Sequence, residues 1–238
     1  MYYGGLMGYY FDPTWILVII GAVLSMAASA TVNSTFNKYS KVRSMTGMTG
    51  EDAAKRLLNS QGIYDVTVRP VKGQLTDHYD PRTKTVNLSE SVFHSTSVAA
   101  IGVAAHEGGH AMQDNVGYVP LKLRGAIVPV ANIGSQAAFP LIIIGVLIGG
   151  MGSPLVNIGL ILFSLAVIFQ LITLPVELNA SRRAITLLDQ VGILGGQEVN
   201  QTRKVLGAAA LTYVAALAAS VLQLLRLVIL FGGRRDND

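Results

Sequence analysis

The segment AAHEGGHAMQD, residues 104–114, contains two of the four histidines in the chain, His106 and His110. Residues four apart on an α-helix project from the same face, about one 5.4 Å pitch apart. Both imidazoles can therefore bind one metal ion, at about 2.0–2.1 Å from each nitrogen. Glu107 is rotated by about 100° around the helix, so it can take a proton from a water molecule on the open side of the metal. The pattern predicts a zinc ion held by two histidines, with Glu107 as general base.

Two simpler interpretations compete with a zinc site. The two histidines could be polar side chains that face water near a membrane surface, or the helix could be an ordinary packing element. Gly108 and Gly109 argue against both, because a glycine inside a helix costs about 1 kcal/mol relative to alanine. Two consecutive glycines predict that something closely approaches the backbone of this helix.

A catalytic zinc site needs a third protein ligand, with the fourth position left for water. His78, His94 and the acidic residues of the chain are the candidates. Glu177 is preferred, because it follows Pro175, which is predicted to start a new helix where a long apolar run ends. The alternative for Glu177 is a solvated charge at a helix N-terminus. Glu177 can reach the two histidines only if the intervening apolar run crosses the membrane an even number of times, or not at all.

The composition is that of a membrane protein. Hydrophobic residues make up 51% of the chain and charged residues 13%, and the mean hydropathy is +0.47. No charged residue occurs within residues 13–37, 125–176 and 205–225. About 20 apolar residues cross a bilayer, so the first and third runs fit one helix each and the middle run fits two. We therefore predict a mainly α-helical integral membrane protein with about four transmembrane helices, and a small α+β zincin-like domain at the membrane face.

The first apolar run has an alternative interpretation as a cleaved signal peptide, because Ala28-Ser29-Ala30 resembles a cleavage site. However, the residues ahead of the run contain Asp12 and no lysine or arginine, which favours a retained anchor. The chain has no cysteine, which excludes disulfides and is typical of a reducing compartment.

Basic residues flank all four predicted spans on one side. These residues are Lys38, Lys41, Arg43, Lys122, Arg124, Arg182, Arg183, Arg203 and Lys204. The positive-inside rule places that side, and the active site with it, on the cytoplasmic face of the cell membrane. Arg226 and the two arginines of the tail oppose this orientation, so the last span could instead end in an interfacial stretch. The net charge of +4 is assigned to contact with lipid headgroups, and no nucleic-acid partner is expected.

The polar segment after the first span is predicted to form the small α+β domain. Thr49 followed by Asp52 indicates a capping box, and Gly62 ends the helix that it begins. Residues 66–71 and 85–89 alternate like strands, and Pro70 indicates that the first of them lies at an edge. Ser95, Thr96 and Ser97 offer N-caps for the helix that carries the two histidines.

The predicted organisation has five parts. An N-terminal anchor covers residues 1–37, the α+β domain residues 38–124, and a transmembrane hairpin residues 125–176, with its turn at residues 149–154. A helical segment with the third zinc ligand covers residues 177–204, and a C-terminal transmembrane helix with a basic tail covers residues 205–238.

The segments LTDHYDPR (75–82), VNLS (86–89) and 97–113 closely resemble the YugP-type membrane zinc metallopeptidases. The likeness continues through residues 34–41 and 175–177, and so covers most of the chain. These proteins look like distant relatives of the HtpX and CAAX-protease group. The resemblance implies that His106, His110 and Glu177 bind zinc and that Glu107 is the catalytic base. In HtpX-like enzymes an aspartate commonly lies four residues after the glutamate ligand, whereas Ser181 stands at that position here.

The predicted function is hydrolysis of peptide bonds by a zinc metallopeptidase whose substrate is a peptide or a membrane protein. A zinc-stabilised membrane adaptor or chaperone-like protein without turnover is the alternative, and Glu107, which a structural zinc site does not need, favours the enzyme. A transporter is less favoured, because the spans of transporters usually contain charged or broken helices, whereas the apolar runs here contain no charged residue.

Residues 85–89 could hold an extended substrate as an edge strand, or form an ordinary hairpin. His78 and Tyr79, on the loop before that strand, could donate a hydrogen bond to the oxyanion.

Overall fold

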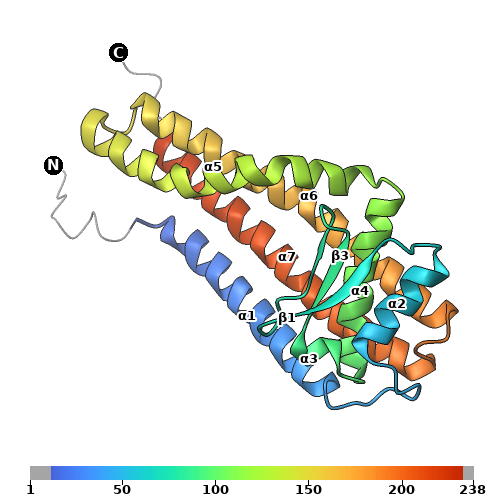
Figure 1. The fold of residues 1–238 in the computed structure, drawn as a ribbon. Helices are drawn as coiled ribbons and strands as arrows, with labels where there is room; N and C mark the ends of the chain where they lie inside the picture. Colours follow the sequence, from blue (N-terminus) through green and yellow to red (C-terminus); the bar gives the residue numbers. More distant parts are fainter. Residues whose placement is uncertain (1–11, 233–238) are drawn as a thin grey trace. The chain divides into compact units, whose positions relative to one another are not determined.

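The computed structural model describes residues 12–232, and it shows a mainly helical chain with one small sheet (Figure 1). The helices are α1 (Trp15–Tyr39), α2 (Gly50–Ser60), α3 (Glu90–Phe93), α4 (Val98–Asn115), α5 (Val119–Gly149), α6 (Pro154–Gln190) and α7 (Gly196–Phe231). The strands are β1 (Thr67–Val71), β2 (His78–Asp80) and β3 (Thr85–Ser89). Helices α1, α5, α6 and α7 are long and apolar enough to cross a membrane. The predicted fold class, with its four spans, is confirmed.

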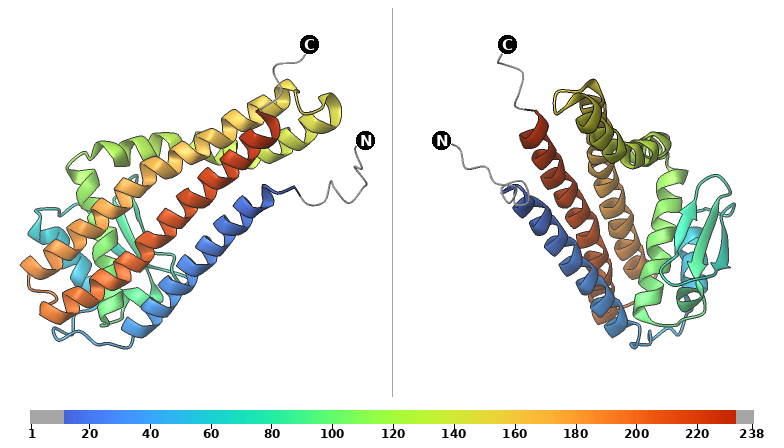
Figure 2. Two further views of the ribbon diagram at one scale, coloured as in Figure 1. Left: turned by 180° about the vertical axis from the view of Figure 1, so that it is seen from behind. Right: turned by 90° about the vertical axis from the view of Figure 1, so that its left-hand side faces the viewer.

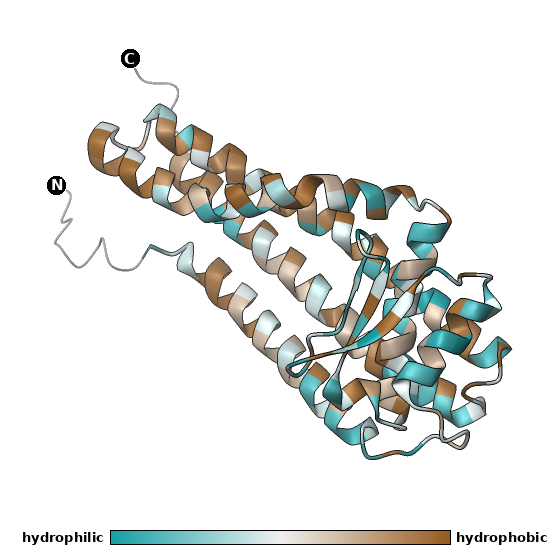
Figure 3. Cartoon of the chain, in the orientation of Figure 1, coloured by the Kyte–Doolittle hydropathy of each residue, from teal (hydrophilic) through white to brown (hydrophobic). Residues whose placement is uncertain are grey.

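The chain folds into two compact units. The helical unit consists of residues 12–27, 124–172 and 213–232 of the described chain, and the mixed unit of residues 28–123 and 173–212. Apolar residues cover the long helices of the helical unit, where Figure 3 shows brown along α5 and α6. Polar residues appear mainly on α2 and the connecting segments of the mixed unit (Figure 3). This division agrees with a membrane-spanning part and a part in contact with water.

Glycines allow α5 and α6 to approach closely in the helical unit. A Cβ added to Gly159 would lie 2.8 Å from the carbonyl oxygen of Ala138, and one added to Gly134 would lie 3.1 Å from that of Leu162. Small residues are the usual means by which transmembrane helices pack, because lipid gives apolar side chains no reason to prefer one another. The predicted turn also forms, since α5 ends at Gly149 and α6 begins at Pro154.

The charge of Arg226 is neutralised within the helical unit. Its guanidinium lies 3.5 Å from Asp12 and stacks on the ring of Trp15 at 4.3 Å. Hydrogen bonds from Thr14, together with the charge of Arg226, hold the pKa of Asp12 below its usual range. Helix α7 continues unbroken past Arg226. An arginine that opposed the predicted orientation thus has a local partner, and the helix does not break at its position.

The mixed unit contains a three-stranded sheet in the order β1-β3-β2. Strand β3 pairs in parallel with β1, and antiparallel with β2. Strand β1 lies at an edge, as Pro70 predicts. The hypothesis that residues 85–89 form an edge strand for substrate is wrong, because hydrogen bonds to β1 and β2 occupy both sides of β3. His78 and Tyr79 belong to strand β2 and not to a loop.

Helix α4 forms the centre of the mixed unit. The sheet and α2 lie on one side of it, and the mixed-unit ends of α6 and α7 lie on the other (Figure 2). The predicted capping box of α2 is present, with Thr49 and Asp52 each accepting from the other's backbone N–H. Ser97 caps α4 by accepting from the N–H of Ala100. These local signals fix where the two helices begin.

Candidate metal centre

His106 and His110 lie on one face of α4, one turn apart, as their spacing predicts. Their rings meet edge to face, with 4.8 Å between centroids. Both side chains are largely buried, at 14% and 10% exposed. The helix around them consists of small residues that are packed on nearly every side. The packed helix therefore holds the two imidazoles in a fixed orientation.

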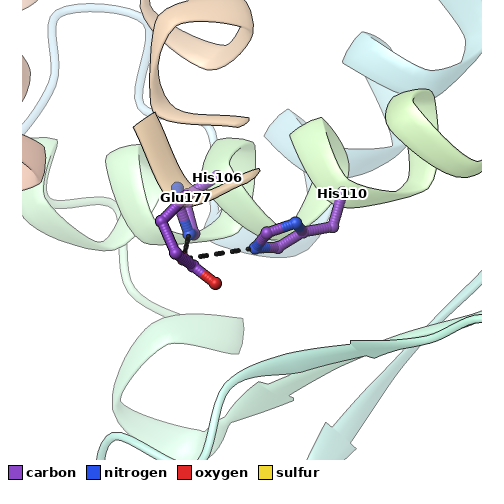
Figure 4. A group of neighbouring side chains, drawn as sticks. All are labelled: His106, His110 and Glu177. Atoms are coloured by element: carbon purple, nitrogen blue, oxygen red, sulfur yellow. Dashed lines mark hydrogen bonds and ion pairs between the residues drawn. The ribbon is translucent and has the colours of Figure 1, made fainter. Parts of the chain in front are cut away.

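The Glu177 carboxylate reaches both histidines from helix α6 (Figure 4). One carboxylate oxygen, Oε2, lies 3.2 Å from Nε2 of His106 and 3.5 Å from Nε2 of His110. The ligand atoms around a tetrahedral zinc with bonds of about 2.0–2.1 Å are separated by about 3.3 Å. The observed separations are thus those of two edges of such a tetrahedron. Two imidazoles and one carboxylate are also a ligand set of catalytic zinc sites.

Burial makes this group of three costly without a cation. The Glu177 side chain is 2% exposed, and a buried carboxylate is expensive unless it is paired. Burial alone would lower the pKa of His110, but its hydrogen bond to Glu177 and the charges of Glu107 and Glu177 raise it overall. The negative charges at this position therefore favour a cation, and a divalent metal supplies more charge than a proton. The residues present fit a zinc ion.

The predicted helix start at Pro175 is wrong. Helix α6 runs without a break from Pro154 to Gln190, with Pro175 inside it. Proline removes one backbone hydrogen bond, and such a loss is tolerated in long apolar helices when neighbouring elements hold the chain. Here Val176, Glu177 and Ala180 are all buried after the proline. Packing in the mixed unit outweighs the local tendency of proline to begin a helix.

Helix α6 approaches α4 closely at Gly109. A Cβ added to Gly109 would lie 2.6 Å from the carbonyl oxygen of Ala180. A Cβ added to Gly108 would meet nothing within 4 Å. The expectation of a close approach is thus correct for one glycine of the pair. That contact brings Glu177, three residues before Ala180, within reach of the two histidines.

A buried amide sets the tautomer of His110. The side chain of Gln113 is fully buried, and its Nε2 donates to the carbonyl oxygen of Val176 at 2.8 Å and to Oδ1 of Asn179 at 3.0 Å. Oδ1 of Asn179 also accepts from Nε of Arg183 at 2.9 Å. Because the amide nitrogen of Gln113 must donate, its Oε1 accepts from Nδ1 of His110 at 3.0 Å. Nε2 of His110 is therefore the nitrogen that faces Glu177, and once it gives up its proton its lone pair can bind a metal.

Ser181 has the corresponding place beside His106. Its hydroxyl lies 3.0 Å from Nδ1 of His106, which leaves Nε2 directed at Glu177. The sequence alone does not indicate what Ser181 contacts. Sequence reasoning also missed the part played by Gln113, whose position three residues after His110 on the same helix could have indicated it.

Glu107 lies beside the two histidines but makes none of their contacts. The residue is 8% exposed, and within residues 12–232 no hydrogen bond or ion pair holds its carboxylate. A carboxylate that is close to the cluster, nearly buried and unengaged is suited to accept a proton.

The other candidate residues lie elsewhere. His78 is exposed, with Nδ1 and Nε2 engaged by Thr76 and Asn87. His94 is exposed at the end of α3. Neither belongs to the group of possible metal ligands found in the described chain. The Tyr79 hydroxyl donates to Asp114 at 2.9 Å, and burial together with this bond raises the pKa of Tyr79. Its proton is therefore already engaged in this structure.

Comparisons with known proteins agree with the chemistry of this cluster. A family model described as "Putative neutral zinc metallopeptidase" matches residues 14–232. The "Putative membrane protease YugP" of Bacillus subtilis (strain 168) is 49% identical over 222 residues, which cover 93% of this chain and 98% of the relative. No solved structure matches the chain significantly. The resemblance predicted from the sequence is confirmed.

Proposed function

This chain belongs to the neutral zinc metallopeptidase family, and on that premise we propose that it is a membrane-bound endopeptidase whose zinc ligands are His106, His110 and Glu177. The convergence of these three side chains from α4 and α6, with donor separations suited to zinc, is the observation that supports the proposal. A zinc ion held there supplies a Lewis acid that polarises the scissile carbonyl and lowers the pKa of an attacking water to about 7.

The residues of the chain then perform the remaining tasks. Glu107 takes the proton of the attacking water and delivers it to the leaving amine. Gln113 holds His110 in the tautomer with the proton on Nδ1, and Ser181 orients the ring of His106 so that its Nε2 faces Glu177. A purely structural zinc site has no use for an unengaged carboxylate beside its ligands, so Glu107 favours an enzyme over a zinc-stabilised adaptor. The substrate class is a peptide or a membrane protein.

Replacing Glu177 by glutamine is expected to weaken zinc binding by more than about 100-fold. Loss of a residue that only hydrogen-bonds a metal ligand already weakens metal binding by about 10–100-fold, and Glu177 is proposed as a ligand itself. The change exchanges an anionic oxygen ligand for a neutral one. The zinc dissociation constant, measured by competition with a chromophoric chelator, and the rate of peptide hydrolysis should deteriorate together. Glu90→Gln is the matched control, since Glu90 is exposed on α3. Undiminished affinity in Glu177→Gln would exclude this residue as a ligand.

The active site is further proposed to face the cytoplasm, because basic residues flank the polar ends of the spans. The chain lacks cysteine, so single cysteines can be introduced at exposed positions: Gln61, Thr186 and, in the turn between α5 and α6, Gly152. A membrane-impermeant maleimide added to intact cells should label the cysteine at 152 only. Labelling at 61 or 186 before permeabilisation would reverse the orientation.

A further inference from the structure

A cavity of about 350 Å³ lies between α6 and α7 in the mixed unit. Its wall includes the apolar side chains of Leu178, Leu206 and Ala210 and the basic side chains of Arg182 and Arg203. This volume lies within the range of small-molecule sites, roughly 300–1,000 Å³. An apolar floor with cationic side chains beside it suits a ligand that has both an anionic group and a hydrocarbon part.

The basic side chains of the cavity lack acidic partners. Arg182 is exposed and forms no hydrogen bond or ion pair with any residue in the range 12–232. Arg203 is also exposed, and its guanidinium makes one long contact, 3.4 Å to the neutral Asn200. Glu198, an acid in the first turn of α7, is already used by the backbone N–H groups of Met45 and Gly195. Two positive charges therefore remain available to an anion.

The sequence of each helix places the cavity at the end of its apolar run. On α6 the charge-free run ends at Val176, Leu178 follows it, and Arg182 lies about 6 Å further along the axis. On α7 the order is reversed, because Arg203 precedes a charge-free run that contains Leu206 and Ala210. Along the cavity, the residues of both helices thus change from charged to apolar in the same direction. A phospholipid has the same order, since its phosphate lies at the surface and its acyl chains lie deeper.

We propose that this cavity binds an anionic phospholipid, with the phosphate between Arg182 and Arg203 and the start of an acyl chain along Leu178, Leu206 and Ala210. Juxtamembrane lysine and arginine each contribute attraction to anionic lipid, and guanidinium forms strong paired hydrogen bonds with phosphate. Ser181, which contacts His106, also lines the cavity. The lipid therefore lies one side chain away from the metal centre, but the proposal does not depend on catalysis.

Binding of dioleoyl-phosphatidylglycerol to the purified full-length protein in detergent, followed by native mass spectrometry, tests the site. The wild type should retain about one molecule, and dioleoyl-phosphatidylcholine should be retained much less. The double variant Arg182→Gln/Arg203→Gln should bind phosphatidylglycerol about thirty-fold more weakly, as expected for the loss of two cation–phosphate attractions. The matched control Lys72→Gln/Arg82→Gln removes the same charge from exposed positions outside the cavity and should bind like the wild type.

A second variant tests the apolar half of the cavity without changing its charge. Gly207 lines the cavity, and a Cβ there meets nothing within 4 Å, so Gly207→Leu should fill the floor and displace the lipid from a folded protein. Equal melting temperatures without lipid identify folded variants. Phosphatidylglycerol binding that survives both changes would overturn the proposal. Equal retention of the two lipids would do so too, as would displacement of the lipid by millimolar inorganic phosphate, which would indicate a site for free phosphate.

Discussion

Glu107→Gln is expected to keep its zinc and to lose peptide hydrolysis by about 10²–10⁴-fold. The carboxylate accepts no hydrogen bond from the described residues and stands outside the group of His106, His110 and Glu177. Glutamine has nearly the same size but cannot take a proton. Zinc content by mass spectrometry and turnover of a fluorogenic peptide, both on purified protein, separate the two effects.

Two outcomes would contradict the role given to Glu107. Hydrolysis at the wild-type rate would show that another group serves as base. Loss of zinc from the glutamine variant would place Glu107 among the ligands, and the position assigned to Glu177 would then have to be reconsidered. Glu90→Gln, on the exposed side of α3, controls for the loss of one negative charge.

Features that depend on neighbouring residues were predictable from the sequence. The capping box of α2, the N-cap of α4 and the spacing of His106 and His110 each involve residues within one helical turn. The four spans follow from runs without charge, because the cost of placing a charge in lipid acts on each segment separately. The division of the chain into five parts stays a prediction.

Features that depend on distant segments were not predictable in the same way. Strand β3 is central because β1, which is separated from it in the sequence by β2, pairs with its second side. Pro175 stays inside a helix because of packing around Val176 and Ala180. Gln113 gains its role only because the carbonyl of Val176 lies next to it. In each case a contact between segments overrides or completes a local tendency, and one sequence contains no direct record of that contact.

Only one glycine of the α4 pair, Gly109, closely approaches another helix, and the sequence alone does not show which of the two it is. This contact leads to the second prediction with a large expected effect. Gly109→Ala should weaken zinc binding and slow hydrolysis by about 10²-fold, the cost of misplacing a catalytic group by about 1 Å. The new Cβ would lie 2.6 Å from the Ala180 carbonyl oxygen, against an ordinary contact of 3.4–4 Å. A backbone atom cannot rotate away, so α6 must shift and move Glu177 from the two histidines. Such overpacking also costs about 1–3 kcal/mol of stability.

Gly108→Ala is the matched control for this prediction. It adds the same methyl group to the adjacent residue, where a Cβ meets nothing within 4 Å, and alanine there should stabilise the helix by about 1 kcal/mol. Zinc titrations and thermal unfolding with and without zinc, run on both variants, provide the comparison. We expect Gly108→Ala to bind zinc as the wild type does and to unfold at a slightly higher temperature. Equal zinc affinities for the two variants would mean that close contact between α4 and α6 does not position Glu177.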